Sequence, residues 1–337
     1  MAEMEISLLA VLALALAAEF VNGWTDAPNA IATVVSTRAL TMRKAVALAS
    51  VLNVLGAMSG TAVAATIGKG IVESSVIDLT TVAAAMSAVI VWSVTAWRFG
   101  LPTSESHALV AALAGAGLAS AGPEVMLWVG WKKVLIGLSL STCLGLGGAY
   151  IFTKIVRACA APFPSGKTKP ALRRLQILSS AFMAFSHGSN DGQKFIGVFA
   201  LALLLSGVGG VEVIGGKLSI PLWIILLCAS VMGCGTLMGG LRIIRTMGVK
   251  MARIEAYQGF SAETAAASTI LLASHFGIPL STTHTIGTSL MGTTLARRRS
   301  ALRIGIVKNI VLAWLLTFPV CGALAFAITH LVRFAFF

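Results

Sequence analysis

Two aspartates lie inside stretches that are otherwise apolar, and each belongs to a short polar cluster. Asp26 lies in GWTDAPNA (residues 23–30), and Asp191 lies in GSNDGQKF (residues 188–195). A carboxylate among apolar helices is costly unless it is paired, protonated or facing water, so such residues are functional candidates by default. Because each cluster interrupts an apolar run, we expect a discontinuous helix at each aspartate. The hydroxyl and amide groups beside them are those of Thr25, Asn29 and Asn190.

A second pair of motifs has the pattern Pro-x-Ser-x-x-His. Its members are Pro102, Ser104 and His107 in one copy and Pro279, Ser281 and His284 in the other. The proline predicts a helix start and the serine falls at its cap, where free N–H groups and the positive end of the helix dipole attract anions. Two such ends facing each other would surround a tetrahedral oxyanion; the alternative is two ordinary N-caps. The histidines could relay protons or simply hold the turn.

Other charged residues near these motifs are weaker candidates. Lys194 follows Asp191 by three residues, where it could neutralise that carboxylate, attract anions or extend to an interface. Glu105 stands where the other Pro-Ser motif has Thr282, so it could bind a proton or a cation, or face water. Weaker candidates still are His187, Glu19 and Glu263.

The elements that position these residues must be membrane helices. The chain is 57% hydrophobic and only 11% charged, against about 25% charged residues in soluble domains. Its mean hydropathy is +0.91, and its apolar residues are close to the roughly 200 that ten spans would need. The 34 glycines suit close helix packing or broken helices. The fold class is therefore an all-α membrane protein embedded in the lipid bilayer.

Composition also excludes other classes of function. The net charge of +13 comes from basic residues between apolar runs, which sets membrane topology, and nothing in their pattern suggests a nucleic-acid surface. The five cysteines are scattered without metal-ligand spacing, so they are interpreted as packing residues. We expect no catalytic residues and no cofactor beyond a coupling ion.

The chain also divides into two related halves. FGLPTSESH (residues 99–107) and FGIPLSTTH (residues 276–284) are identical at five of nine positions and lie 177 residues apart, whereas the two aspartates lie 165 apart. We therefore predict a first repeat at 1–153, a basic cytoplasmic linker at 154–174 and a second repeat at 175–337.

The charges of equivalent loops predict how the two halves are oriented. Loops 38–44, 245–257 and 296–308 are basic, and their equivalents in the other half are poor in basic residues. Under the positive-inside rule, equivalent loops lie on opposite sides of the membrane. This predicts an inverted repeat of two five-segment halves with discontinuous or re-entrant helices at the midplane, and both termini outside.

The motifs resemble those of the inorganic phosphate transporter family of secondary carriers. That family has a Gly-x-Asn-Asp-x-x-Asn-Ala signature and a Pro-x-Ser-Thr-Thr-His signature in inverted halves, and residues 188–194 and 279–284 match closely. The resemblance implies ion-coupled uptake of phosphate through the cytoplasmic membrane and a homodimer. The residues implied to line the anion and coupling-ion sites are Asp26, Asn29, Ser104, Asn190, Asp191, Ser281 and Thr282.

The departures from the signatures leave the coupling ion open between Na⁺ and H⁺. Thr25 replaces the family asparagine, and Glu105 replaces a threonine, so the coupling-ion candidates are Asp26, Asp191 and Glu105. If the ion is Na⁺, its candidate site lies between the two aspartates. Phosphate near neutral pH keeps an O–H that can donate to a carboxylate, whereas sulfate has none, so acidic residues favour phosphate. A cation between the aspartates would screen them and would couple its own binding to that of the anion.

Three alternatives remain. A sulfate or other oxyanion symporter of the same family would use the same residues. A divalent-metal carrier would need soft ligands or several carboxylates together, and methionine is absent from both motifs. An intramembrane hydrolase built on Ser-x-x-His would need a single asymmetric nucleophile, whereas here serine and histidine are duplicated.

Overall fold

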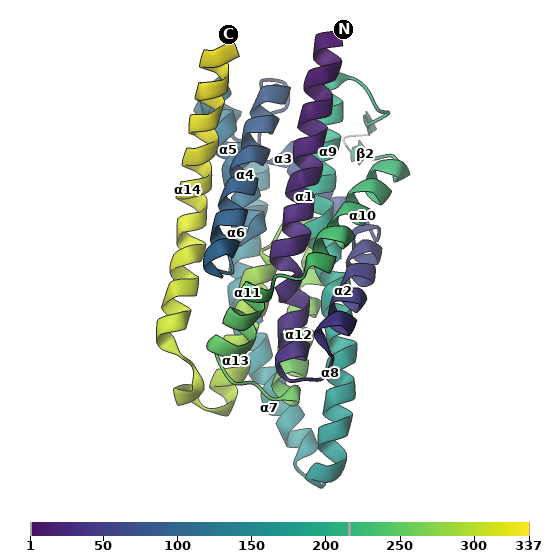
Figure 1. The fold of residues 1–337 in the computed structure, drawn as a ribbon, viewed down its shortest axis with the longest axis vertical. Helices are drawn as coiled ribbons and strands as arrows, with labels where there is room; N and C mark the ends of the chain where they lie inside the picture. Colours follow the sequence, from purple (N-terminus) through teal and green to yellow (C-terminus); the bar gives the residue numbers. More distant parts are fainter. Residues whose placement is uncertain (1, 215–216, 337) are drawn as a thin grey trace.

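The computed structural model describes residues 2–214 and 217–336, which form a long bundle of α-helices (Figure 1). The helices are α1 (Ala2–Ser36), α2 (Met42–Ala57), α3 (Ala62–Gly70), α4 (Leu79–Phe99), α5 (Glu105–Ala121), α6 (Trp128–Cys143), α7 (Ala149–Ala160), α8 (Ser165–His187), α9 (Gln193–Ser206), α10 (Leu222–Met238), α11 (Leu241–Arg245), α12 (Ala256–His275), α13 (Thr282–Arg297) and α14 (Ile304–Phe336). Two short strands, β1 (Glu212–Ile214) and β2 (Lys217–Ser219), pair antiparallel. The prediction of an all-α protein is correct apart from this hairpin.

Several helices are long and apolar enough to cross a bilayer. Among the described residues, four spans meet this test by length and composition, at Leu8–Ser36, Leu79–Phe99, Trp128–Ala160 and Ile304–Phe334. Two bent pairs raise the number to six, α2 with α3 at 69° and α10 with the stretch Leu241–Lys250 at 58°. Helices α5 and α13 have 17 and 16 residues, too few for about 30 Å of hydrocarbon, whereas α9 continues α8 through a π-helical turn. Not every predicted segment is therefore a complete crossing.

The two ends of the bundle differ in charge. Both termini lie at one end, and the turn between α7 and α8 lies at the other (Figure 1). Near that turn, the Arg173 guanidinium donates to the Arg38 carbonyl, and Arg157 Nη1 donates to the Ala296 carbonyl at 3.4 Å. The loops predicted to be basic thus gather away from the termini. The stretch 154–174, predicted to be a basic linker, forms the end of α7, the start of α8 and the turn between them.

Each Pro-Ser motif lies at the tip of a helical hairpin. Helices α4 and α5 open toward the termini, where the Thr81 and Ser120 hydroxyls lie 2.7 Å apart and Arg333 of α14 pairs with Asp78 at 2.9 Å. Helices α12 and α13 open toward the opposite end, where Arg297 pairs with Glu255 at 2.8 Å. The tips meet, since the Ser106 hydroxyl donates to the Leu280 carbonyl at 2.9 Å. Both hairpins therefore turn back inside the bundle, which hydropathy alone leaves undecided.

The prediction of a discontinuous helix at Asp26 is wrong. Helix α1 continues through the motif, although Pro28 lies inside it. Proline has no N–H for the carbonyl four residues earlier, and the Trp24 carbonyl instead accepts the N–H of Gly240 at 3.3 Å. Gly240 lies at the break between α10 and α11, which supplies the free donor. Helix α1 thus lacks one internal hydrogen bond at Pro28 but is not interrupted there.

At Asp191 the chain is wound into a π-helical turn, Gly188–Gly192, between α8 and α9. Such wide turns leave backbone groups out of the regular pattern and often occur at functional sites. The backbone stays helical on both sides, so the expected discontinuity takes the form of a local widening. Gly188 allows this turn to pack closely, because a Cβ there would lie 2.1 Å from the Asn53 carbonyl oxygen of α2.

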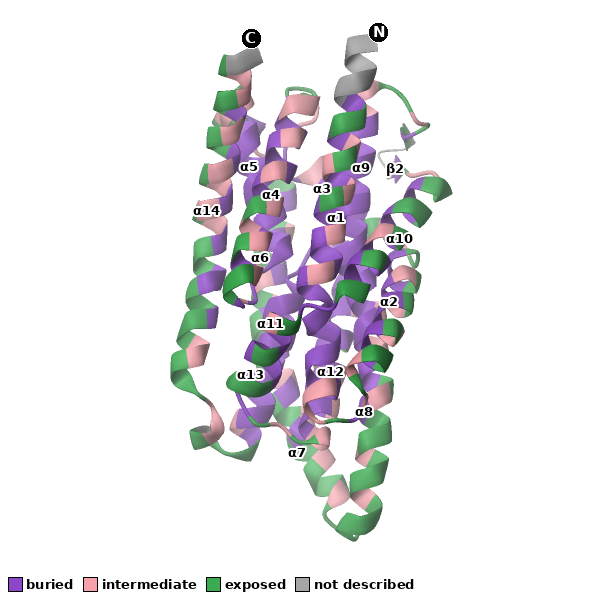
Figure 2. Ribbon diagram, viewed as in Figure 1, coloured by how far each residue is buried: buried purple, intermediate pink, exposed green. Residues whose placement is uncertain are grey.

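Burial concentrates along the axis of the bundle, and the outer faces of the helices are exposed (Figure 2). Helix α1 lies among α4, α8, α9 and α10, and its motif is fully enclosed. Many polar side chains are buried at this level, whereas large exposed residues such as Leu178, Leu315 and Phe334 are apolar. This inversion of the pattern of soluble proteins is expected where lipid surrounds the bundle.

Candidate functional site

The two hairpin tips begin with capped helices. Ser104 precedes α5, and its hydroxyl accepts the His107 main-chain N–H at 3.2 Å; Ser281 precedes α13 and accepts the His284 N–H at 3.1 Å. Both serines are therefore N-caps, as one of the two predicted alternatives required. Each hydroxyl oxygen accepts from the helix turn, which leaves its O–H free to donate, and the other first-turn N–H groups have no partner within their helix.

The two histidines lie edge to face, with ring centroids 4.5 Å apart. The ring of His107 packs against Phe318, and that of His284 packs against Trp314, both from α14. They line a groove of about 430 Å³ with mostly apolar walls. Ser104 and Ser281 bond to histidine main-chain groups, and in the described residues His107 Nδ1 and His284 Nε2 have no hydrogen-bond partner. The histidines thus belong to the contact with α14.

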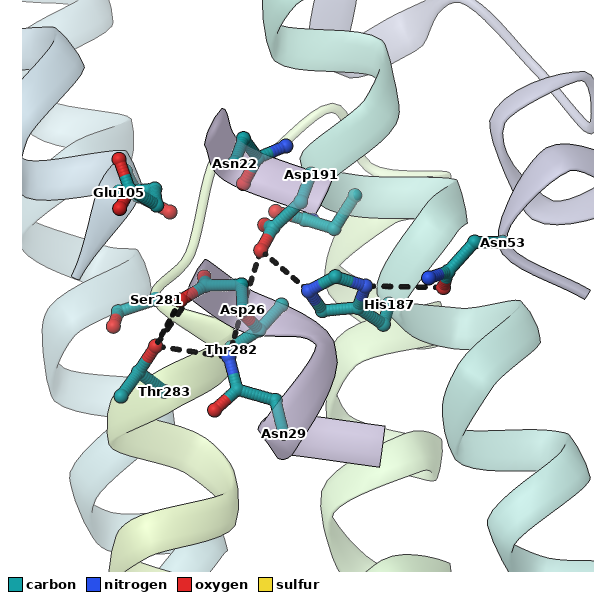
Figure 3. Close-up of polar contacts among 12 residues, drawn as sticks. Asn22, Asp26, Asn29, Asn53, Glu105, His187, Asp191, Ser281, Thr282 and Thr283 are labelled. Atoms are coloured by element: carbon teal, nitrogen blue, oxygen red, sulfur yellow. Dashed lines mark hydrogen bonds and ion pairs between the residues drawn. The ribbon is translucent and has the colours of Figure 1, made fainter. Parts of the chain in front are cut away.

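Asp191 is the most heavily paired carboxylate at the tips. Its Oδ1 accepts from the Lys194 ammonium, and its Oδ2 accepts from the Thr282 hydroxyl at 2.6 Å. His187 Nε2 lies 3.1 Å from the same Oδ2, while its Nδ1 lies 3.0 Å from Asn53 Oδ1 (Figure 3). Asp191 and Lys194 are each 1% exposed. Buried charges need such partners, so this pair satisfies both members.

Asp26 has weaker partners. The Thr283 hydroxyl donates to its two carboxylate oxygens at 3.4 and 3.5 Å, and Thr283 in turn accepts from Asn29 Nδ2 at 2.9 Å (Figure 3). Asn29 also reaches Thr282 Oγ1 at 3.4 Å. In the described part of the chain, the ion pairs of Lys194 and His187 go to Asp191, and no ion pair reaches Asp26. Among the described residues, Asp26 is therefore a buried carboxyl group whose hydrogen-bond partners are neutral.

The two aspartates nevertheless lie together. One ligand atom from each of Asp26, His187 and Asp191 falls within 4.8 Å of the other two. Carboxylate and hydroxyl oxygens suit hard cations such as Na⁺, and the imidazole nitrogen would also suit a transition metal. The grouping of two carboxylates meets the ligand requirement of a divalent-metal carrier, so the sequence argument against that class loses force.

Glu105 and Thr25 form a separate branch beside the aspartates. The Thr25 hydroxyl donates to Glu105 Oε1 at 2.8 Å, and Ser93 of α4 donates to Oε2 at 2.6 Å. Thr25 thus joins the hairpin tip to α1 one residue before Asp26. Thr25 and Glu105, the two residues that depart from the family signatures, are therefore hydrogen-bonded to each other.

The Asn190 amide donates to the α12–α13 hairpin and not to the aspartates. Its Nδ2 donates to Ser274 Oγ at 2.9 Å and to the Ile278 carbonyl at 3.2 Å. Ser274 and Ser189 also border a polar hollow of about 360 Å³ near the break between α2 and α3. Asn190 therefore links the π-helical turn to the end of α12 and to the segment that leads into α13.

Glu19 and Glu263 lie outside the cluster. Asn22 donates to Glu19 at 3.1 Å on α1, nearer the terminus. Glu263 on α12 accepts from Thr33 and Ser179, two turns of α1 beyond Asp26. Both carboxylates are fully buried, yet neither contacts the hairpin tips.

Sequence reasoning missed three residues that the fold brings to the site, Ser106, Thr283 and Asn53, and gave His187 no definite role. Ser106 and Thr283 occupy equivalent places in the two Pro-Ser motifs, and that equivalence could have identified them. His187 was noted without a role, although it lies one helical turn before Asp191. Asn53 belongs to no motif, and the only signal was an amide within an apolar helix.

Comparisons with known proteins agree with this arrangement. A family model described as "Phosphate transporter family" matches residues 22–167 and 160–325. A "Probable low-affinity inorganic phosphate transporter" of Mycobacterium bovis is 38% identical over 334 residues, which cover 96% of this chain and 78% of that protein. A protein of the same description from Bacillus subtilis is 37% identical, covering 94% of this chain and 96% of its own length.

A solved structure is also similar. It is described as "The sodium-dependent phosphate transporter", and it superposes with a TM-score of 0.86 at 25% identity. The superposition covers 98% of this chain and 99% of that one. The likeness therefore extends over the whole bundle and includes both hairpins.

Proposed function

This chain belongs to the phosphate transporter family, and from that membership we propose that it imports inorganic phosphate across the cytoplasmic membrane as a symporter driven by Na⁺ or H⁺. It is a multi-pass membrane protein, and phosphate is the substrate that its family transports. The observation that carries the symport proposal is the meeting of Asp26 and Asp191 with hydroxyl and amide donors between the two hairpin tips.

The donors present suit a protonated oxyanion. Thr282 and Thr283 offer hydroxyls and Asn29 offers an amide, and all three now contact one another or the aspartates. A phosphate that enters between the tips would take over these donors and would give its own O–H to a carboxylate. Helix N-termini on both sides would add main-chain N–H groups and the favourable ends of two dipoles.

Coupling follows from the charge of the aspartates. An anion is repelled by an ionised buried carboxylate that lacks a cationic partner. Among the described residues Asp26 has none, whereas Asp191 is paired with Lys194. Binding of Na⁺ or a proton at Asp26 removes this repulsion, with Asp191 and Glu105 as further candidates. Phosphate and cation then favour each other's binding, which is the thermodynamic requirement for symport.

Alternating access would come from the repeated architecture. The hairpins that open toward opposite ends and the charge difference between those ends support an inverted repeat. We place the termini outside and the turn between α7 and α8 in the cytoplasm, because the basic loops gather there. A homodimer is proposed from the family resemblance.

The test is uptake of labelled phosphate into proteoliposomes with the Na⁺ and pH gradients imposed one at a time. The proposal predicts uptake driven by one of the gradients and abolished in Asp26→Asn. Excess sulfate serves as the competitor. Uptake of labelled sulfate with phosphate as the weaker competitor would favour a sulfate symporter, and uptake of phosphate that ignores both gradients would contradict symport.

A further inference from the structure

The ammonium group of Lys194 is held entirely by protein oxygens. Lys194 is 1% exposed, and its Nζ donates to Asp191 Oδ1, to the Ser106 hydroxyl and, at 2.8 Å, to the Leu280 carbonyl. A lysine ammonium has three N–H donors. All three are therefore used, so none is left to bind an incoming anion.

The surroundings of this ammonium are those of a bound alkali cation. A carboxylate, a hydroxyl and a main-chain carbonyl are hard oxygen ligands, and a carbonyl at the end of a broken helix is a common ligand for Na⁺ in transporters. Leu280 supplies such a carbonyl, because residues 278–281 lie outside regular secondary structure between α12 and α13. The compact charge of Lys194 thus occupies a place where a monovalent ion would fit.

The other half of the protein holds a matching set of residues without the lysine. A shift of 165 residues places Asp26 on Asp191 and Asn29 on Lys194, and a shift of 177 places Ser106 on Thr283. We call Asp26, Asn29 and Thr283 the first triad, and Asp191, Lys194 and Ser106 the second triad.

Both triads are assembled in the structure. In the first, Asn29 Nδ2 lies 2.9 Å from Thr283 Oγ1, which lies 3.4 Å from the nearer oxygen of Asp26. In the second, the Lys194 ammonium contacts both the Asp191 carboxylate and the Ser106 hydroxyl. The triads therefore differ in charge by one permanent positive group at a single position.

We propose that Lys194 is a built-in substitute for one coupling cation, so that of the two related cation sites only the first triad takes a mobile ion. The inference rests on the proposed symport function. Asn29 in the first triad can turn its amide oxygen toward a cation, whereas Lys194 permanently neutralises Asp191. Each transported phosphate then needs one fewer mobile cation than a protein with an uncharged residue at position 194.

The test makes the second triad resemble the first. Lys194→Asn removes the tethered charge and leaves the oxygens of Asp191, Ser106 and Leu280 for Na⁺. The matched control is Lys133→Asn, which removes a lysine whose side-chain hydrogen bond within residues 2–214 and 217–336 goes to the Thr66 hydroxyl at 3.1 Å, outside the triads. Initial rates of phosphate uptake into proteoliposomes are measured against Na⁺ concentration, with choline keeping the ionic strength constant.

The expected result is that Lys194→Asn needs one more Na⁺ than the wild type. The Hill coefficient for Na⁺ should rise by about one, or a Na⁺ dependence should emerge where the wild type has none. Lys133→Asn should follow the wild type. Transport by Lys194→Asn with an unchanged Na⁺ dependence would overturn the proposal.

A binding measurement covers the case in which the variant does not transport. Na⁺ that binds the folded protein raises its thermal stability. In detergent, Na⁺ should raise the melting temperature of Lys194→Asn more than that of the wild type or of Lys133→Asn. An equal or smaller rise overturns the inference. This comparison is separate from the proposed function, which fails if the wild type takes up no phosphate.

Discussion

Replacing Asp191 by asparagine should destabilise the protein much more than the same replacement at Asp26. Asp191 pairs with the buried ammonium of Lys194, whereas Asp26 is contacted by neutral donors in the described residues. Removing one member of a buried ion pair leaves an uncompensated charge and destabilises by about 3–5 kcal/mol. The asparagine oxygen, together with Ser106 and Leu280, can still accept from Lys194, so the lower figure, about 3 kcal/mol, applies.

The assay is thermal unfolding of the purified variants in detergent, followed in parallel with phosphate uptake. For a chain of this size, about 3 kcal/mol lowers the melting temperature by roughly 6 °C, at about 2 °C per kcal/mol. Asp26→Asn should lose uptake while keeping its melting temperature within about 1 °C of the wild type, since the asparagine oxygen can still accept from Thr283 and no ion pair among the described residues is broken. The double variant Asp191→Asn with Lys194→Gln removes both charges and should regain most of the lost stability.

Two results would refute this reasoning. If Asp26→Asn lost as much stability as Asp191→Asn, Asp26 would have a compensating partner of its own. If the double variant were no more stable than Asp191→Asn, the loss of stability in Asp191→Asn would not come from the unpaired Lys194 ammonium.

Three further predictions concern single contacts. Thr282→Ala removes the hydroxyl that donates to Asp191 at 2.6 Å, so the apparent KM for phosphate should rise about tenfold, whereas Thr294→Ala, which removes a hydroxyl bonded within its own helix, should leave KM unchanged. Glu263→Gln should lower the stability by about 1 kcal/mol in thermal unfolding, because the new glutamine NH₂ group faces a hydroxyl that now donates to the carboxylate of Glu263. A changed KM for phosphate in this variant would contradict the placement of Glu263 outside the site. Pro28→Ala restores a helix N–H in the motif, so it should raise the melting temperature and lower the maximal uptake rate. An unchanged rate would mean that the hydrogen bond missing from α1 at Pro28 has no part in transport.

The fold class and the location of the site could be predicted because they depend on local or additive properties. Membrane insertion follows from the sum of apolar residues, and the caps at Ser104 and Ser281 involve a backbone group only three residues away. The clustering of basic loops at one end follows from their composition. The expectation that helix α1 breaks at Asp26 failed because Gly240, distant in sequence, supplies the donor that Pro28 leaves missing.

The sequence by itself determined which carboxylates are functional candidates, since a buried acid among apolar residues is costly wherever the chain runs. Only the tertiary structure decided how those acids differ. Thr282 reaches Asp191 across 91 residues, and Thr283 reaches Asp26 across 257. The hairpins bring these groups together from opposite ends, and Lys194 gains Ser106 and Leu280 as partners only where the tips meet. The charge balance of the two aspartates depends on contacts between distant segments, and no local pattern specifies such contacts.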